Sequence, residues 1–386
     1  MTTAAPLDAR PRWAAFALVC LAYLAVTAGE QGLSPVMPDI SAEFGVSEGQ
    51  SGLAFGLLAL SIAVANIAGG ALLGKLGART LMLCGLAATV AGAVLAAITN
   101  GFGVLVAAQV LLGAGAGFYF PAGLQAVPYL SGAGRRGLAM GLYGVAFSGG
   151  LLVAALLGAL GAAQGWRVAF WCAAGLAGAA FVATLTLRLA PATGDPVTVR
   201  FPRKAVLGLP TFIGGIAAVC QYGAIPFLTT FAVDEWGLRA GQAAALLAVG
   251  RVLSIVAKLV SGAGMDRSGP IASARTTGLV IAATGVLWVL LPAGAPAYVC
   301  AALFAGSVSS LGPISNFVAV DQFGGDGPSL GAFRSAQIGI GAAAGWLIGR
   351  IGETVGLRWT LLAASVSPLL LVVLLPRRVR AVAATD

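Results

Sequence analysis

Charged side chains are scarce in this sequence, and histidine is absent. Asp, Glu, Lys and Arg make up 9% of the 386 residues and apolar residues 59%, whereas ordinary soluble domains carry about 25% charged residues. This small number of charged side chains cannot cover a water-exposed surface. The composition therefore predicts a protein whose surface faces lipid. Without histidine the chain lacks the commonest general base, metal ligand and pH switch. We therefore expect no enzyme, no metal site and no cofactor.

Cysteine is also sparse, and its spacing forms no metal or redox motif. The five cysteines lie far apart inside apolar runs and are interpreted as small core residues: Cys20, Cys84, Cys172, Cys220 and Cys300. The net charge of +9 does not indicate a nucleic-acid partner, because the basic residues gather between the apolar runs, as membrane topology requires.

Twelve long apolar runs are present. A bilayer core of about 30 Å is crossed by about 20 helical residues, whereas a transmembrane barrel uses strands of about ten residues with alternating polarity. The runs are twice that length and do not alternate, so the sequence predicts an all-α membrane protein with twelve transmembrane helices. They lie near 13–37, 50–73, 79–99, 102–127, 138–162, 166–189, 206–232, 242–264, 271–292, 296–320, 331–352 and 357–376.

Lysine and arginine predict the orientation. If the N-terminus is cytoplasmic, sixteen basic residues fall on the cytoplasmic side and four on the outer side. The cytoplasmic set includes Arg10 and Arg377 near the two ends. Because inner loops are enriched in Lys and Arg, we expect a multi-pass protein of the cell membrane with both termini in the cytoplasm. We also expect the protein to act as a monomer.

The chain repeats itself at an offset of 191 to 192 residues. Six helices per copy place both copies in the same direction, as in parallel repeats related by an axis along the membrane normal. The longest polar stretch lies between them. We therefore predict an N-terminal six-helix bundle at 1–190, a cytoplasmic linker at 191–205 and a C-terminal six-helix bundle at 206–386, related by pseudo-two-fold symmetry. The matches are Gly32 and Pro35 with Gly223 and Pro226, 44–50 with 236–242, Gly70 and Gly77 with Gly262 and Gly269, and Gly158, Gly165 and Arg167 with Gly349, Gly356 and Arg358.

One loop carries a specific motif. The segment GAGMDRSG, residues 262–269, has the pattern GxxxDRxG, and its first-half copy GALLGKLG, residues 70–77, has Gly74 in place of the acid. With the two-fold repeat, this motif resembles the major facilitator superfamily. The resemblance implies a cytoplasmic latch made by Gly262, Asp266, Arg267 and Gly269, with Gly70 and Gly77 as its first-half copy. By symmetry, we expect Asp266 to face the positive N-terminus of the fifth helix.

The resemblance to proton-driven drug antiporters is weaker. Gln109 stands where those relatives carry an arginine in helix four, and the glycine pattern of their helix five is reduced to GVAFSGGLL, residues 144–152. Both departures disfavour drug export without excluding it.

Two basic residues inside one span are the clearest candidates for chemistry. Arg251 and Lys258 lie seven residues apart, on one helix face and about 10 Å apart along the axis. Charges cost about 2.5–3.5 kcal/mol each at the bilayer centre, and the first-half equivalents, Ala59 and Asn66, are uncharged. The segment resembles nitrate porters and oxalate/formate exchangers, which often carry a substrate-binding arginine where this chain has Lys258. The resemblance therefore implies a role in substrate binding. A structural salt bridge of Arg251 and a snorkelling Lys258 are the alternatives.

Glu30 is the single acid within a predicted span. It is a candidate for proton coupling, for binding a cationic group or for pairing with Arg251, unless it is an outer-facing charge at the helix end. Its counterpart is Gln221. Gln221 and Tyr222 are candidate substrate contacts. Tyr119 is a further candidate, with packing as its alternative role.

These features favour a secondary transporter for a small organic or inorganic anion, such as a monocarboxylate. Two cations and one acid suit proton symport by alternating access. The alternative is an exporter of hydrophobic drugs or metabolites, and the third class is a membrane sensor or scaffold, which would carry soluble domains. The expected partners are a small-molecule substrate, the lipid bilayer and protons, with no nucleic acid.

Overall fold

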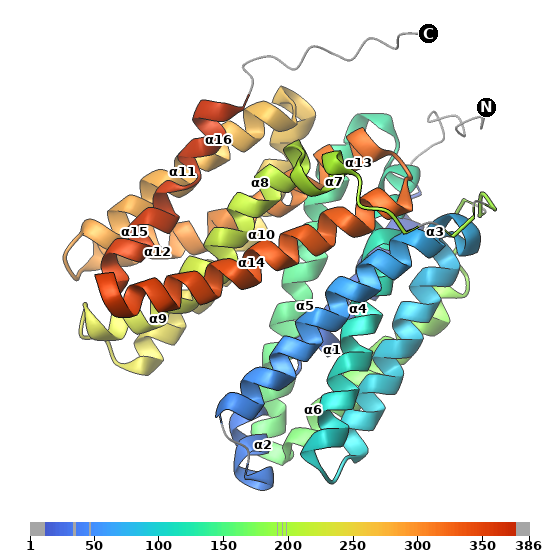
Figure 1. Ribbon diagram of the computed structural model, residues 1–386, viewed down its shortest axis with the longest axis horizontal. Helices are drawn as coiled ribbons and strands as arrows, with labels where there is room; N and C mark the ends of the chain where they lie inside the picture. Colours follow the sequence, from blue (N-terminus) through green and yellow to red (C-terminus); the bar gives the residue numbers. More distant parts are fainter. Residues whose placement is uncertain are drawn as a thin grey trace. The chain divides into compact units, whose positions relative to one another are not determined.

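The computed structural model describes residues 12–33, 36–45, 48–190, 192–194, 196–197 and 199–375. Every regular element in these ranges is a helix (Figure 1). The Arg10, Pro35 and Arg377 of the orientation and repeat arguments lie outside the described residues.

The first part of the chain forms long helices joined by short turns. They are α1 (Trp13–Glu30), α2 (Met37–Phe44), α3 (Glu48–Ile98), α4 (Phe102–Ser131), the 3₁₀ turn η2 (Ala133–Arg135), α5 (Arg136–Gln164) and α6 (Trp166–Thr184). The second part has more breaks. It contains α7 (Arg203–Leu207), α8 (Leu209–Ala218), the π-helical segment η3 (Val219–Ala224), α9 (Ile225–Asp234), α10 (Ala240–Ser268), α11 (Pro270–Leu290), α12 (Ala295–Val308), α13 (Leu311–Phe323), α14 (Gly327–Val355), α15 (Leu357–Val366) and α16 (Leu369–Leu374).

Ten helical stretches of the described chain are long and apolar enough to cross a membrane. One of them, Gly56–Ile98, contains two spans, because its helix is interrupted at Gly77. The 29-residue α14, whose polar residues dilute its hydropathy, brings the count to twelve among the described residues. The predicted all-α membrane fold with twelve transmembrane helices is confirmed.

Four predicted spans are not single α-helices in the structure. The runs at 296–320 and 357–376 divide into α12 and α13 and into α15 and α16, and the other two are the first span of each copy. The run predicted at 13–37 ends as a helix at Glu30, and a short helix, α2, follows it. The run predicted at 206–232 is divided by the π-helical segment η3. Pro226, near the start of α9, has no N–H for the carbonyl one turn before it. This missing donor explains why regular α-helical bonding is not continuous through the span.

Backbone geometry confirms the internal repeat. Gly77 and Gly269 have φ/ψ of 77°/158° and 82°/163°. Gly165 and Gly356 have 101°/134° and 97°/138°. Positive φ values of this kind are easily adopted only by glycine. The near-identical angles at the predicted offsets show that the two copies turn the chain in the same way.

The described residues form two compact units, and each is considered by itself. Unit 1 comprises Met1–Ala133, Ala146–Val206 and Val320–Ser335, and unit 2 comprises Gly134–Val145, Leu207–Ala319 and Ala336–Asp386. A core of unit 1 contains Leu33, Leu105, Leu112, Trp166 and Phe170. In unit 2, α11 packs against α12, α15 and α16 (Figure 1), and Phe231, Trp236, Trp288 and Phe304 form a chain of ring contacts. The predicted division at 191–205 stays a prediction.

Candidate functional site

Helix α10 of unit 2 carries both cations predicted inside a span. The guanidinium of Arg251 makes no hydrogen bond or ion pair with any residue that the structure describes. It is half-buried and interacts electrostatically with Tyr222 and Lys258. A cation that has been withdrawn from water without a carboxylate partner retains most of its capacity to bind an anion.

Lys258 lies deeper in the packing of the same helix. Its side chain is 4% exposed, and its Nζ donates to the Gly144 carbonyl of α5 over 3.0 Å. The Lys258 chain fits there because Gly144 has no side chain: a Cβ on Gly144 would lie 3.3 Å from Cδ of the lysine and 2.6 Å from Cγ of Pro313. The Nζ atom of Lys258 is therefore hydrogen-bonded inside unit 2.

The predicted contacts Gln221 and Tyr222 both fall in the π-helical segment η3. The Oε1 atom of Gln221 accepts a hydrogen bond of 3.2 Å from the Ser309 hydroxyl. Tyr222 is 44% exposed, and its ring covers Gly341 of α14, where a Cβ would lie 2.5 Å from the ring. Single-turn π segments occur frequently at functional sites. Unit 2 thus brings together Tyr222, Arg251 and Lys258.

Glu30 lies in unit 1, at the last residue of α1. Its carboxylate accepts a hydrogen bond of 2.8 Å from Gln31 and interacts electrostatically with Arg334. The Arg334 guanidinium lies 4.5 Å from the centre of the Phe120 ring, a distance typical of a cation–π contact. Arg334 thus contacts an aromatic ring inside unit 1, and Glu30 interacts electrostatically with this same arginine.

Tyr119 is fully buried in unit 1. Its hydroxyl donates to the Val19 carbonyl over 2.7 Å, and its ring stacks on Tyr23 with centroids 5.8 Å apart. These contacts account for its polar atom and its aromatic face. Direct binding of a substrate by Tyr119 would require the bond to Val19 to break.

Asp266 lies where the repeat predicts, at the N-terminus of α5. Its Oδ1 accepts the Gly137 N–H over 2.7 Å, and its Oδ2 accepts the Leu138 N–H over 2.8 Å. Gly262 allows this approach, because a Cβ there would lie 2.8 Å from the Gly137 carbonyl. Arg267 is exposed, and Gly269 makes the turn into α11. The carboxylate satisfies two amides that a helix start leaves without partners.

The first-half copy of this loop packs on α14 within unit 1. A Cβ on Gly70 would overlap the Gly327 carbonyl, so the two backbones touch. Gly77 makes the same turn as Gly269. Gly74 stands in place of the acid, and its carbonyl accepts the Gly194 N–H over 3.1 Å.

The long spans, the repeated glycine turns and the Asp266 loop agree with a comparison of the whole sequence. A family model described as Major Facilitator Superfamily matches residues 19–337. The chain belongs to the Major Facilitator Superfamily.

Solved structures of the superfamily share this fold. The human organic anion transporter MFSD10 (TETRAN) superposes with a TM-score of 0.80 over 95% of this chain and 100% of that one, at 17% identity. The E. coli fucose:proton symporter FucP gives a TM-score of 0.77 over 94% and 98%, also at 17% identity. At these identities the likeness establishes the fold alone.

Among curated relatives, the probable sulfoacetate transporter SauU of Cupriavidus necator is 29% identical over 154 residues. The aligned part covers 40% of this chain and 36% of SauU. The chain therefore aligns with little more than a third of the length of SauU.

A repeated ion pair escaped the sequence-based prediction. In unit 1, Arg167 donates to both carboxylate oxygens of Glu43, over 3.0 and 2.7 Å. In unit 2, Arg358 donates to Glu235 over 2.8 Å. The two arginines were matched in the repeat, and the two glutamates lie 192 residues apart. Extending the alignment to acids would have revealed these clamps, which join the segment after the first span of each copy to the start of its last.

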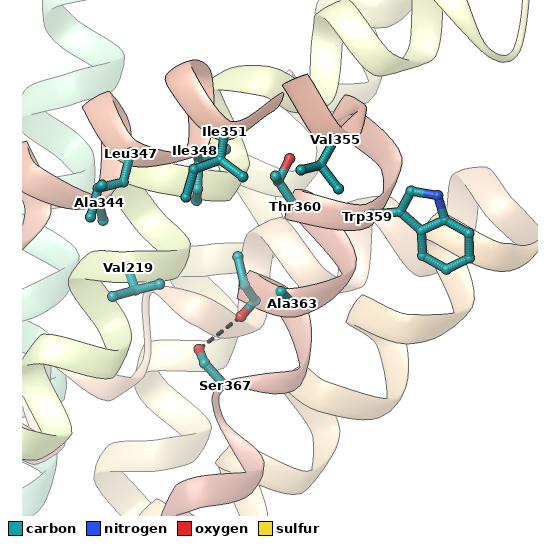
Figure 2. Close-up of a pocket in the computed structure, with 11 residues that line it drawn as sticks. Val219, Ala344, Leu347, Ile348, Ile351, Val355, Trp359, Thr360, Ala363 and Ser367 are labelled. Carbon is teal, nitrogen blue, oxygen red and sulfur yellow. Dashed lines mark hydrogen bonds between the residues drawn. The ribbon is translucent and has the colours of Figure 1, made fainter. Parts of the chain in front are cut away.

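Unit 2 also contains an apolar groove of about 440 Å³ (Figure 2). Ile348 and Ile351 of α14 line one side, Trp359 lies at one end, and Val219 belongs to the π-helical segment η3. The Ser367 hydroxyl at its border donates to the Ala364 carbonyl over 2.7 Å. The groove therefore offers a ligand little besides hydrocarbon surface.

Proposed function

We propose that this protein is a secondary active transporter that moves a small anion, of the carboxylate or sulfonate class, across the cytoplasmic membrane by alternating access. The substrate charge is bound by Arg251, with Tyr222 and Gln221 beside it and Lys258 as a second positive charge. Glu30 is the proposed proton-coupling group.

The observation that carries this proposal is Arg251 itself. Basic side chains in the middle of a membrane span are costly and usually serve a substrate or ion pathway. The guanidinium has five donors in a fixed fork that fits a carboxylate or sulfonate, and no described residue takes its charge. A substrate anion would supply the missing counter-charge.

Lys258 supports the same chemistry in another way. Because its ammonium is bonded to the Gly144 carbonyl, it adds positive potential without having to contact the substrate. The two cations lie about two helical turns apart, so a small anion at Arg251 experiences both fields. A neutral or cationic substrate would meet repulsion or an uncompensated polar group at this place.

The sulfoacetate named for SauU is a small dianion of the class proposed here. Proton symport suits such a substrate, because a protonated Glu30 would reduce the net charge that moves across the bilayer. The proposal thus assigns binding to unit 2 and coupling to unit 1.

Uptake by proteoliposomes containing the purified protein tests the assignment. We expect uptake of labelled sulfoacetate or a short monocarboxylate to respond to an imposed pH gradient. Arg251→Ala should reduce it at least tenfold, because a charge-assisted hydrogen bond contributes about 1.5–3 kcal/mol. Arg350→Ala is the matched control, since Arg350 is highly exposed and forms its ion pair within the described chain with Glu353. Wild-type uptake by Arg251→Ala would refute the assignment.

The alternative function, export of hydrophobic drugs or metabolites, is favoured by the apolar groove. Its volume lies within the range of about 300–1,000 Å³ typical of ligand pockets. A thermal-stability panel separates the two functions. Carboxylates and sulfonates should raise the melting temperature if the anion proposal holds. Lipophilic compounds, with an effect removed by Ala363→Trp at the groove, would favour export.

We also propose the orientation and gating of the transporter. Residues 1–190 and 206–386 act as the two moving six-helix bundles, joined by the linker 191–205, with both termini in the cytoplasm. Gly262, Asp266, Arg267 and Gly269 would then form a cytoplasmic latch, with the packing of Gly70 and Gly77 as its first-half copy. The support is the charge distribution of the loops and the carboxylate–amide contacts of Asp266.

A further inference from the structure

The two copies of the latch differ at the acid, and the repeat shows which contacts the first half lacks. Asp266 bonds the amides of Gly137 and Leu138. The repeat maps α5 onto α14, which has the same length of 29 residues. At an offset of 191, the two amides correspond to Pro328 and Ser329. Asp266 itself corresponds to Gly74, which has no side chain to offer.

The start of α14 is compatible with this absence. Pro328 has no N–H, so only the Ser329 amide remains to be satisfied. That amide donates to Oδ2 of Asp326 over 3.1 Å, which makes Asp326 a cap for its own helix. The other carboxylate oxygen, Oδ1, accepts a hydrogen bond from Arg200 over 2.8 Å. The acid that caps α14 is thus the residue just before the helix, Asp326, and its ion-pair partner, Arg200, is a residue of the linker.

The other end of the linker is hydrogen-bonded to the 70–77 loop, in which Gly74 stands in place of the acid. The Thr193 hydroxyl and the Gly194 N–H both donate to the Gly74 carbonyl, over 3.2 and 3.1 Å. Ala192 packs on Gly77, where a Cβ would lie 3.3 Å from the Ala192 nitrogen. All these contacts lie within unit 1.

We propose that the linker is the first-half latch. Its residues 192–194 and Arg200 form a strap that ties the 70–77 loop to the N-terminus of α14, through Gly74 and the Arg200–Asp326 ion pair. This inference rests on the proposed transport cycle, in which α14 must separate from the 70–77 loop. Arg200 and Asp326 are positioning residues: they set how often α14 leaves the loop and do not touch substrate.

The strength of the strap is limited by the solvent exposure of its ion pair. The side chains of Arg200 and Asp326 are 58% and 31% exposed, so water and salt screen the pair. Pairs of this kind change an equilibrium by about two- to fivefold. A strap of this strength suits a contact that opens in every cycle, whereas a buried pair would resist opening.

Accessibility of a single reporter cysteine tests the strap without any substrate. The five native cysteines are replaced, and Ser329→Cys, at a position 6% exposed at the start of α14, is labelled with a membrane-impermeant maleimide in inverted vesicles. We expect Arg200→Ala and Asp326→Asn each to increase the labelling rate about two- to fivefold. Asp326→Asn keeps an oxygen for the Ser329 amide, so it removes the ion pair and spares the helix cap.

Controls separate the strap from general effects of charge. The conservative variant Arg200→Lys, which keeps a positive charge beside Asp326, should leave labelling within twofold of the reference. Arg203→Ala is the matched control, because Arg203 is exposed and forms no ion pair within the described chain. Labelling that is unchanged in Arg200→Ala and Asp326→Asn, or equally faster in Arg203→Ala, would overturn the proposal. Because no substrate is present, failure of the anion assignment leaves this result unaffected.

Discussion

Replacing Asp266 by asparagine removes one negative charge from the N-terminus of α5. The wild-type carboxylate accepts two amide protons, over 2.7 and 2.8 Å. Asparagine has one acceptor oxygen, and its amide nitrogen would point a donor at the second N–H. The variant therefore keeps one weakened hydrogen bond, loses the other and removes the favourable interaction of an anion with the helix dipole.

The magnitude follows from these losses. Charge at a helix N-terminus stabilises by about 0.3–1 kcal/mol at exposed sites. A hydrogen bond to a charged group contributes about 1.5–3 kcal/mol and a neutral one about 0.5–1.5 kcal/mol. Asp266 is exposed, so the lower part of each range applies. We expect Asp266→Asn to lower the free energy of unfolding by about 1–3 kcal/mol.

Reversible unfolding in mixed detergent micelles measures this difference. The adjacent Arg267→Gln is a suitable control, because Arg267 is exposed and has no ion pair among the described residues. It should change the unfolding free energy by less than about 0.5 kcal/mol, as surface substitutions usually do. An equally small change for Asp266→Asn would refute the reasoning, since it would mean that the two carboxylate–amide contacts contribute nothing net.

Three further substitutions have defined outcomes. Hydrogen bonds from Arg167 hold the pKa of Glu43 below its usual value, so Glu43→Gln should lower the free energy of unfolding by less than about 1 kcal/mol at pH 7. When unfolding is measured against pH, the difference between wild type and variant should be full above pH about 4.3. It should vanish as the pH falls through the lower pKa of Glu43 in the folded state. Gly262→Val would place atoms against the Gly137 carbonyl and should cost about 1–3 kcal/mol, visible as a lower melting temperature, whereas an unchanged value would show that α10 can move away from α5. Both side-chain amide atoms of Gln109 are buried without a partner in the described structure, so Gln109→Leu should stabilise by about 1–2 kcal/mol in the same assay, and a loss of stability would instead indicate a bound water.

The sequence predicted most of the fold because lipid imposes strict rules on the chain. Long apolar runs must be helices, since a lipid-exposed backbone has no other partner for its polar groups. The repeat then placed Gly77 and Gly269 in matching turns and Asp266 at the start of α5, as observed. These predictions concern local geometry and were transferable between the two copies.

The sequence could not predict contacts that only one copy makes. The contact of Arg334 with Phe120 and the attachment of the linker to Gly74 have no first- or second-half counterpart to indicate them. Tyr119 illustrates a different limit, because whether a tyrosine hydroxyl faces a cavity or a carbonyl such as that of Val19 depends on packing. The roles of Arg251, Lys258 and Glu30 stay predictions.

The π-helical segment η3 has a consequence for how its span tolerates changes in length. Such a segment corresponds to one residue more than the α-helical turn it replaces, and one residue corresponds to about 100° of rotation. The helices on either side of Val219–Ala224 are therefore out of phase by about a quarter of a turn. Deleting one residue there would remove this phase difference and rotate Tyr222 relative to Arg251, with which it interacts electrostatically, although the donor missing at Pro226 would still be missing. The extra residue thus sets the direction in which the Tyr222 side chain leaves the helix.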